Sequence, residues 1–80
     1  MIQELVQGKL EEFQDLGYIG HLEPVQFDGE SLTATAYIPR EHWNRQDRQR
    51  ILSALTDLED EHDITVEVRL TREREHAPGE

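Results

Sequence analysis

The chain has 80 residues, no cysteine, and a formal net charge of −10 that arises from 18 acidic and 8 basic residues. The lack of cysteine excludes a disulfide framework, a thiolate metal site and a cysteine nucleophile. The acidic surplus repels nucleic acids and anionic membranes at long range, and it fits either plain solubility or docking on a basic partner. No run approaches the roughly 20 apolar residues of a membrane span, and Glu4 stands where a signal peptide is basic. We therefore expect a soluble, cytoplasmic protein.

Residues 2–16 are predicted to form an amphipathic helix. Its apolar residues recur at helical spacing: Ile2, Leu5, Val6, Leu10, Phe13 and Leu16. Gly17 is well placed as the left-handed residue that ends this helix.

A β-hairpin is predicted over residues 22–38, with its turn at Asp28-Gly29. Both turn residues tolerate positive φ, as the primed hairpin turns require. After the turn, apolar and polar residues alternate strictly, which is typical of a strand with one buried face. The apolar members are Leu32, Ala34, Ala36 and Ile38.

The length of the hairpin loop is left open by the pattern. A two-residue loop would pair Phe27 with Glu30, and a four-residue loop would pair Phe27 with Leu32. Both keep the apolar residues of the two strands on one face, whereas an odd-length loop would separate them. Pro24 cannot donate to a strand ladder, so the first strand either lies at a sheet edge there or starts after this residue.

A second helix is predicted to begin between Arg40 and Asp47, where Asn44 followed by Asp47 resembles a capping arrangement. Its apolar stripe consists of Ile51, Leu52, Leu55 and Leu58, with Trp43 upstream on nearly the same side. Acidic residues at a helix C-terminus oppose the helix dipole, so we expect helicity to fade by about Asp60.

Residues 64–71 alternate again and predict a third strand with one buried face. A strand-helix-strand crossover makes this strand parallel to the second, and the sequence leaves open whether it lies beside the second or the first. The fold class is therefore α+β: a two-layer αββαβ sandwich with two helices on one face of a three-stranded sheet and a central hairpin. We expect a single domain over residues 1–71 and a flexible charged tail over 72–80.

Recognisable catalytic chemistry is lacking in the sequence. No nucleophile with a base, no tuned carboxylate pair and no metal-ligand spacing stands out, so we expect no enzyme, no cofactor and no metal. Glu61-His62-Asp63 is interpreted as a solvated loop between the second helix and the third strand.

The arginines form two groups, one at the start of the second helix and one at the end of the third strand. Parallel strands would bring both groups to one end of the sheet, where we predict a partner-binding surface. Its residues are Arg40, Trp43, Arg45, Arg48, Arg69 and Arg72. The alternative is that neighbouring acids neutralise these arginines in weak surface pairs: Glu41, Asp47, Glu73 and Glu75.

An acidic run is predicted at the opposite end of the molecule, which would make the domain electrically bipolar. It consists of Asp57, Glu59, Asp60, Glu61 and Asp63. A third candidate surface is the polar face of the sheet, which suits protein contact: Thr33, Thr35, Tyr37, Thr65, Glu67, Arg69 and Thr71.

Six segments of the chain match the pattern of a known domain family: Leu16-Gly17-Tyr18, Val25-Gln26-Phe27, Tyr37-Ile38, Leu52-Ser53-Ala54-Leu55, Leu58-Glu59-Asp60 and Thr65-Val66-Glu67-Val68. Through these segments, residues 5–70 resemble the N-terminal domain of the bacterial ribosome maturation factor RimP. That family has the same element order and is also acidic, and the resemblance implies association with the ribosome. The Ser-Ser-Pro-Gly segment of the family is replaced by Arg69-Leu70-Thr71-Arg72, and its C-terminal barrel has no counterpart in these residues.

The element order is also similar to that of BON-type and ring-building secretion modules, through Asp28-Gly29 and Tyr37-Ile38-Pro39. One topology thus accommodates several functions. We hypothesise a small acidic, non-enzymatic protein-interaction module in the cytoplasm. The alternatives are a ribosome- or RNA-associated domain that uses the arginines, and an acidic inhibitor or nucleic-acid mimic that binds a basic protein through the acidic run. Self-association through a sheet edge is a further expectation.

Overall fold

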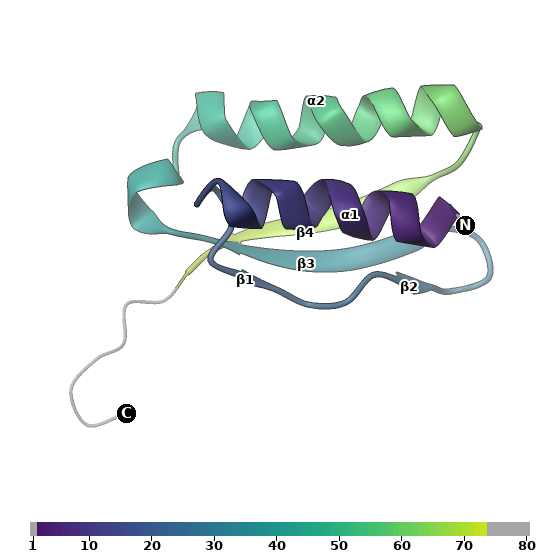
Figure 1. Cartoon of the computed structure of the whole chain (residues 1–80), viewed down its shortest axis with the longest axis horizontal. Coiled ribbons are helices and arrows are strands. Elements are labelled where there is room, and N and C mark those ends of the chain that lie inside the picture. The colour runs from purple at the N-terminus through teal and green to yellow at the C-terminus, as the bar shows by residue number, and fades with distance from the viewer. Residues whose placement is uncertain (1, 74–80) are drawn as a thin grey trace.

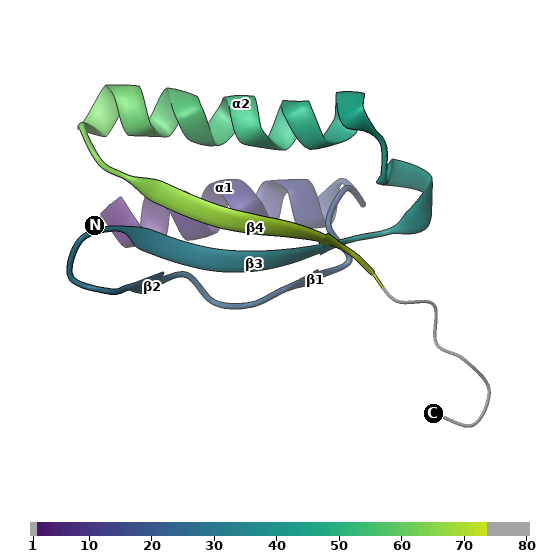
Figure 2. The same ribbon diagram turned by 180° about the vertical axis from the view of Figure 1, so that it is seen from behind.

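The structure is a computed structural model and describes residues 2–73. Its elements follow in this order: α1 (Ile2–Asp15), β1 (His21–Leu22), β2 (Gln26–Phe27), β3 (Leu32–Ile38), the short 3-10 helix η1 (Arg40–His42), α2 (Arg45–His62) and β4 (Val66–Arg72). Both α-helices cover the same face of a four-stranded sheet, and no helix of the described chain covers the other face (Figures 1 and 2). The predicted α+β class is therefore confirmed.

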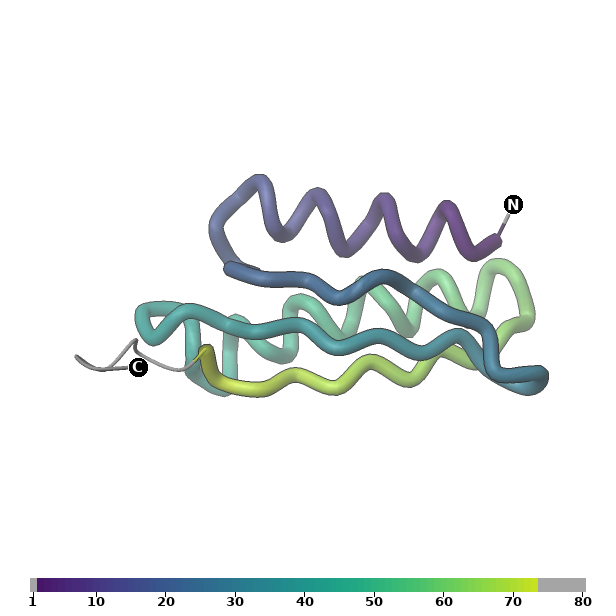
Figure 3. The backbone as a smooth tube through the Cα atoms, turned by 90° about the horizontal axis from the view of Figure 1, so that it is seen from below, coloured from purple at the N-terminus to yellow at the C-terminus, as the bar shows by residue number. Residues whose placement is uncertain are grey.

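Strand β3 lies at the centre of the sheet. Strands β1 and β2 pair antiparallel with one side of it, and β4 pairs parallel with the other (Figure 3). The predicted parallel relation is confirmed, and the place of the third predicted strand is beside the second. Because β4 is parallel to β3 with Ile38 opposite Arg72, the C-terminal ends of both strands lie at one end of the sheet.

The first predicted strand is divided into β1 and β2 by a bulge. Leu22 pairs with Ala36 and Gln26 pairs with Thr33, so three residues of one strand face two residues of β3. Pro24 lies in this bulge, as expected for a residue without a backbone N–H. The bulge turns Val25 into the core, where only 3% of its surface remains exposed.

The hairpin uses the four-residue loop, since Phe27 pairs with Leu32. The primed turn expected at Asp28-Gly29 is wrong, because Gly29 has a φ of 102° while Asp28 does not adopt positive φ. Instead, Asp28 Oδ1 accepts the backbone N–H groups of Glu30 and Ser31 at 2.9 and 2.8 Å. These bonds lower the pKa of Asp28 below its ordinary value of 3.8, with Ser31 contributing most.

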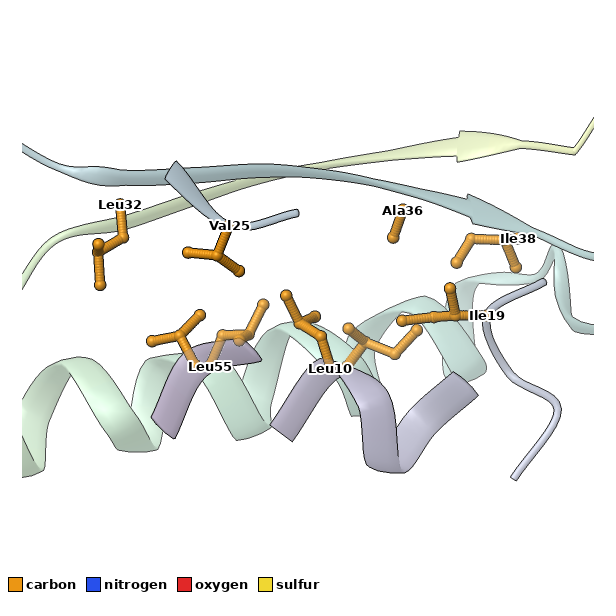
Figure 4. Packing of buried hydrophobic residues seen from close by; sticks show 9 residues of the cluster. Leu10, Ile19, Val25, Leu32, Ala36, Ile38 and Leu55 are labelled. Carbon is orange, nitrogen blue, oxygen red and sulfur yellow. The ribbon is translucent and has the colours of Figure 1, made fainter. Parts of the chain in front are cut away.

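The core lies between the two helices and the sheet (Figure 4). It consists of Val6, Leu10, Ile19, Val25, Leu32, Ala36, Ile38, Ile51 and Leu55. Complete burial of an aliphatic side chain of this size stabilises the fold by about 1.5–3 kcal/mol relative to exposure. The apolar stripes predicted for the two helices are only partly buried: the exposed fraction is 68% for Leu16, 47% for Leu5 and 38% for Leu52.

Helix α2 continues past the predicted end at about Asp60 and ends at His62. Asp63 then adopts the left-handed conformation, with φ 52°, and its N–H donates to the Glu59 carbonyl. Glu59 also accepts the Val66 N–H through Oε2 at 2.9 Å. These local bonds hold the last turn despite its unfavourable charge. At the C-terminus, the expected tail from residue 72 is wrong for Arg72, which belongs to β4; its part from residue 74 lies outside the described residues.

Candidate partner-binding surface

The arginine end is the name used here for the predicted group Arg40, Trp43, Arg45, Arg48, Arg69 and Arg72. Strand β3 leads into η1 and then into α2, while β4 finishes beside the end of β3 (Figure 1). The topology therefore places Arg40, Arg45 and Arg48 at the same end of the molecule as Arg72. Arg69 lies opposite Thr35 in the ladder and is exposed on the helix-free face.

Trp43 both closes the core and orients an arginine. It is half-buried and packs against the core cluster, and the Arg48 guanidinium lies over its ring, 4.4 Å from the centroid. A cation–π contact of this kind is worth about 0.5–1 kcal/mol at an exposed site. Arg48 is therefore held in place by an aromatic ring, and its hydrogen-bond donors stay available to other groups.

Among the described residues, the neutralising surface pairs considered from the sequence are missing for four of the arginines; Glu75 lies outside these residues. Within residues 2–73, no carboxylate lies within 4.0 Å of the guanidinium nitrogens of Arg45, Arg48, Arg69 or Arg72. Asp47 is engaged by His42, whose Nδ1 lies 2.9 Å from Asp47 Oδ2. As far as the described residues go, these four guanidiniums thus leave donors for a partner on an otherwise acidic protein.

The aromatic neighbours of this end escaped the sequence analysis. Tyr18 stacks on His42 with ring centroids 4.5 Å apart, and Arg50 donates to the Tyr18 hydroxyl at 3.3 Å. Tyr18 and His42 are too distant in sequence for a local pattern to connect them. The spacing of Asn44 and Asp47 was the sequence feature that indicated local structure in this region, because it predicted the start of α2.

Asn44 is the N-cap of α2, as its spacing from Asp47 suggested. Its side chain accepts the Asp47 N–H at 2.8 Å and donates to Asp47 Oδ2 at 2.9 Å. Hydrogen bonds from His42 and then Asn44 lower the pKa of Asp47 below its ordinary value of 3.8. The start of α2 and η1 is therefore fixed as one unit beneath the arginine end.

The outer side of β4 is an unpaired strand edge. The Thr65 carbonyl accepts the Leu32 N–H and the Glu73 N–H donates to the Ile38 carbonyl, so the odd-numbered residues direct their backbone groups to β3. Backbone direction alternates along a strand, and the groups of Val68 and Leu70 therefore point outward. Within the described chain β4 pairs with β3 alone, and Figure 3 shows no element beside its outer edge.

The opposite edge of the sheet is protected in three ways. Pro24 removes one donor there, and the bulge interrupts the ladder. Two side chains of helix α1 then form hydrogen bonds with the backbone of Val25: Gln7 Oε1 accepts its N–H at 2.8 Å and Gln3 Nε2 donates to its carbonyl at 2.7 Å. Strand β4 carries no proline and no bulge, so it is the edge open to another strand.

The acidic run lies at the far end of α2, opposite the arginine end (Figure 1). Glu59 caps the Val66 N–H and Asp63 ends the helix, so these two residues have local structural roles. The other three members, Asp57, Asp60 and Glu61, are exposed. The run is thus a solvated helix end that in part stabilises its own turn.

Over residues 2–73, no group of three or more His, Asp or Glu side chains is arranged to hold a metal ion. In the same range no helix has the length and apolar character needed to cross a membrane. No family model, curated protein or solved structure matches the chain. The resemblance to RimP stays a prediction.

Proposed function

We propose that the chain is a non-enzymatic protein-interaction module that takes a strand of a protein partner at the β4 edge, beside the arginine end. The observation that carries this proposal is the difference between the two sheet edges. One edge is closed by Pro24, a bulge and two glutamine side chains. On the other edge, the outward backbone groups of Val68 and Leu70 have no partner among the described residues, and the Val66 N–H is bonded to the Glu59 side chain. Addition of a strand to an exposed sheet edge is a common mode of peptide recognition.

The arginine end supplies a second feature of the same surface. Arg69 and Arg72 belong to β4 itself, and Arg45 and Arg48 start the helix above it. Guanidiniums without a carboxylate in the described chain favour a partner strand that carries acidic side chains near this end. The backbone supplies most of the binding free energy in this mode, and the side chains supply specificity.

A protein partner is favoured over RNA by charge. The net charge of −10 opposes the approach of a phosphate backbone, whereas pairing of strand edges needs no long-range attraction. RNA association through the same arginines is the alternative outcome that the experiment must separate.

The test is capture of partners from a lysate of the native host, with and without nuclease, read by quantitative mass spectrometry. Val68→Pro removes an outward N–H that the fold does not use, and Arg45→Ala with Arg48→Ala removes two free guanidiniums. Lys9→Ala is the matched control, because Lys9 lies on α1 and pairs with Glu12 at 3.4 Å. Far-UV circular dichroism confirms that each variant is folded.

We expect partners that resist nuclease, are lost with Val68→Pro, are reduced by the arginine pair and are retained with Lys9→Ala. Partners lost on nuclease treatment would favour the RNA reading instead. Partners retained by Val68→Pro and lost on charge reversal of Asp57, Asp60 and Glu61 would favour the acidic-mimic reading.

A further inference from the structure

The side chains of β4 divide by face in a way that restricts what can pair with it. Val66, Val68 and Leu70 are half-buried on the helix side, whereas Glu67 and Arg69 are exposed on the helix-free face. Along this edge, charged residues on one face of β4 therefore alternate with apolar residues on the other face.

The backbone permits only some registers between two copies of this edge. Two copies that meet antiparallel must place outward-facing residues opposite each other, because these carry the free N–H and C=O groups. In such a pair, one residue of β4 lies opposite the same residue of the second copy, and the twofold axis passes between them. An axis at Glu67 brings two carboxylates face to face, and an axis at Arg69 brings two guanidiniums face to face. Like charges directly opposite destabilise a strand pair.

The remaining registers differ in how much of the strand they use. An axis at Val66, Thr71 or Arg72 lies near an end of β4 and leaves much of the strand without a partner among the described residues. An axis at Leu70 places Glu67 opposite Glu73. An axis at Val68 places Glu67 of each copy opposite Arg69 of the other. These are non-hydrogen-bonded positions, where opposing Cα atoms approach to about 4.5 Å and side chains are closest, so the charge pairs are as favourable as the sheet allows.

The apolar row matches in the same register. Val68 lies opposite Val68 of the second copy, and Val66 lies opposite Leu70, each pair exchanging hydrogen bonds through its outward backbone groups. Pairing replaces the bond from the Val66 N–H to Glu59 with one to the Leu70 carbonyl of the second copy. The added side chains meet a groove between α2 and the edge that is lined by Leu52, Leu55, Thr56, Val66 and Val68. Leu52, 38% exposed, gains cover from the second copy.

We propose that the chain forms a homodimer by antiparallel pairing of two β4 strands, with the twofold axis at Val68 and reciprocal Glu67–Arg69 pairs across it. The inference rests on the proposed function, since it identifies β4 of a second copy of the chain as the strand that pairs with this edge. The dimer extends the sheet continuously across the axis, with one α2 helix on each side of it.

A charge exchange tests this register. Glu67→Arg and Arg69→Glu each place like charges opposite each other twice in the homodimer, and both residues are exposed. The double variant Glu67→Arg with Arg69→Glu restores opposite charges. A mixture of the two single variants also restores them, but only in the heterodimer. Glu61→Arg and Lys9→Glu are controls that change the net charge by the same amounts away from β4, since Lys9 lies on α1 and pairs with Glu12.

Sedimentation equilibrium from about 1 µM to about 1 mM, the range of micromolar to millimolar dissociation constants, measures the association. We expect a dimer for the wild-type chain and for both controls, and at least roughly tenfold weaker association for each single variant. The double variant recovers the dimer, and native mass spectrometry of the mixture shows the heterodimer. Far-UV circular dichroism verifies folding, and Val68→Pro gives an independent test by abolishing the dimer.

A wild-type chain that is monomeric at every concentration overturns the inference. A dimer that both single variants preserve, or a mixture that forms no heterodimer, overturns the register. If the chain is monomeric and still loses its lysate partners on Val68→Pro, self-pairing fails while the proposed function stands. If lysate partners and dimer are both unaffected by Val68→Pro, both proposals fail.

Discussion

Replacement of Asn44 tests how the start of α2 is held beneath the arginine end. Asn44→Ala removes the acceptor of the Asp47 N–H, a bond of 2.8 Å, and the donor to Asp47 Oδ2. Loss of an N-cap side chain costs about 1 kcal/mol, within a range of roughly 0.5–2 kcal/mol. For a domain of this size, a change of about 1 kcal/mol lowers the melting temperature by roughly 4–8 °C.

The assay is thermal and urea unfolding followed by far-UV circular dichroism. Asn44→Ser is the matched control, because serine keeps the acceptor for the Asp47 N–H and loses only the donor to Oδ2. We expect Asn44→Ser to retain most of the stability that Asn44→Ala loses. Equal melting temperatures for the wild-type chain and Asn44→Ala would refute the assignment of this cap.

Three further changes probe the core, the end of α1 and the charge at η1. Ile51→Ala empties a fully buried site and is expected to lower the free energy of unfolding by about 2–5 kcal/mol in urea titration, and a loss under 1 kcal/mol would contradict this packing. Gly17→Ala is expected to cost about 1–2 kcal/mol because φ is 89° there. Gly8→Ala, where an added Cβ meets nothing within 4 Å, should instead stabilise by up to about 1 kcal/mol; equal signs for the two would count against the assigned helix end. Because bonds from His42 and Asn44 lower the pKa of Asp47 below 3.8, its stabilisation is present above that pH and is lost as the pH falls below it. The difference in unfolding free energy between the wild-type chain and Asp47→Asn should therefore shrink on acidification, and a constant difference would contradict the bonded carboxylate.

Most of the fold could be predicted because local patterns and short-range connections agree. Alternation in residues 32–38 and helical spacing in residues 2–16 each point to one element. The crossover from β3 through α2 then requires β4 to be parallel, which brings the two arginine groups to one end.

What the sequence did not reveal depends on contacts between distant segments. At the bulge beside Pro24, Gln3 and Gln7 of α1 form hydrogen bonds with the backbone of Val25, and no local pattern indicates those bonds. The last turn of α2 persists because Glu59 finds the Val66 N–H beyond the helix end. In the hairpin, the bonds of Asp28 to the loop replaced the expected primed turn.

The candidate surface likewise has some features that the sequence predicts and others that depend on contacts between distant segments. The positions of Arg45, Arg48 and Arg72 at one end follow from topology, which the sequence predicts. The stack of Tyr18 on His42 and the open state of the β4 edge depend on which strand occupies each side of β3. That order is set by the packing of the whole sheet and has no signature in any one segment.

Residue-resolved amide hydrogen exchange of β4, measured by NMR at low and at high protein concentration, tests the open edge most directly. At low concentration we expect the N–H groups of Glu67, Arg69 and Thr71 to be protected by β3 and those of Val68 and Leu70 to exchange rapidly. When a second strand pairs with the edge, Val68 and Leu70 should become protected as well. Slow exchange of Val68 and Leu70 in the dilute chain, or rapid exchange of both in the associated state, would contradict an edge that is open and takes a strand.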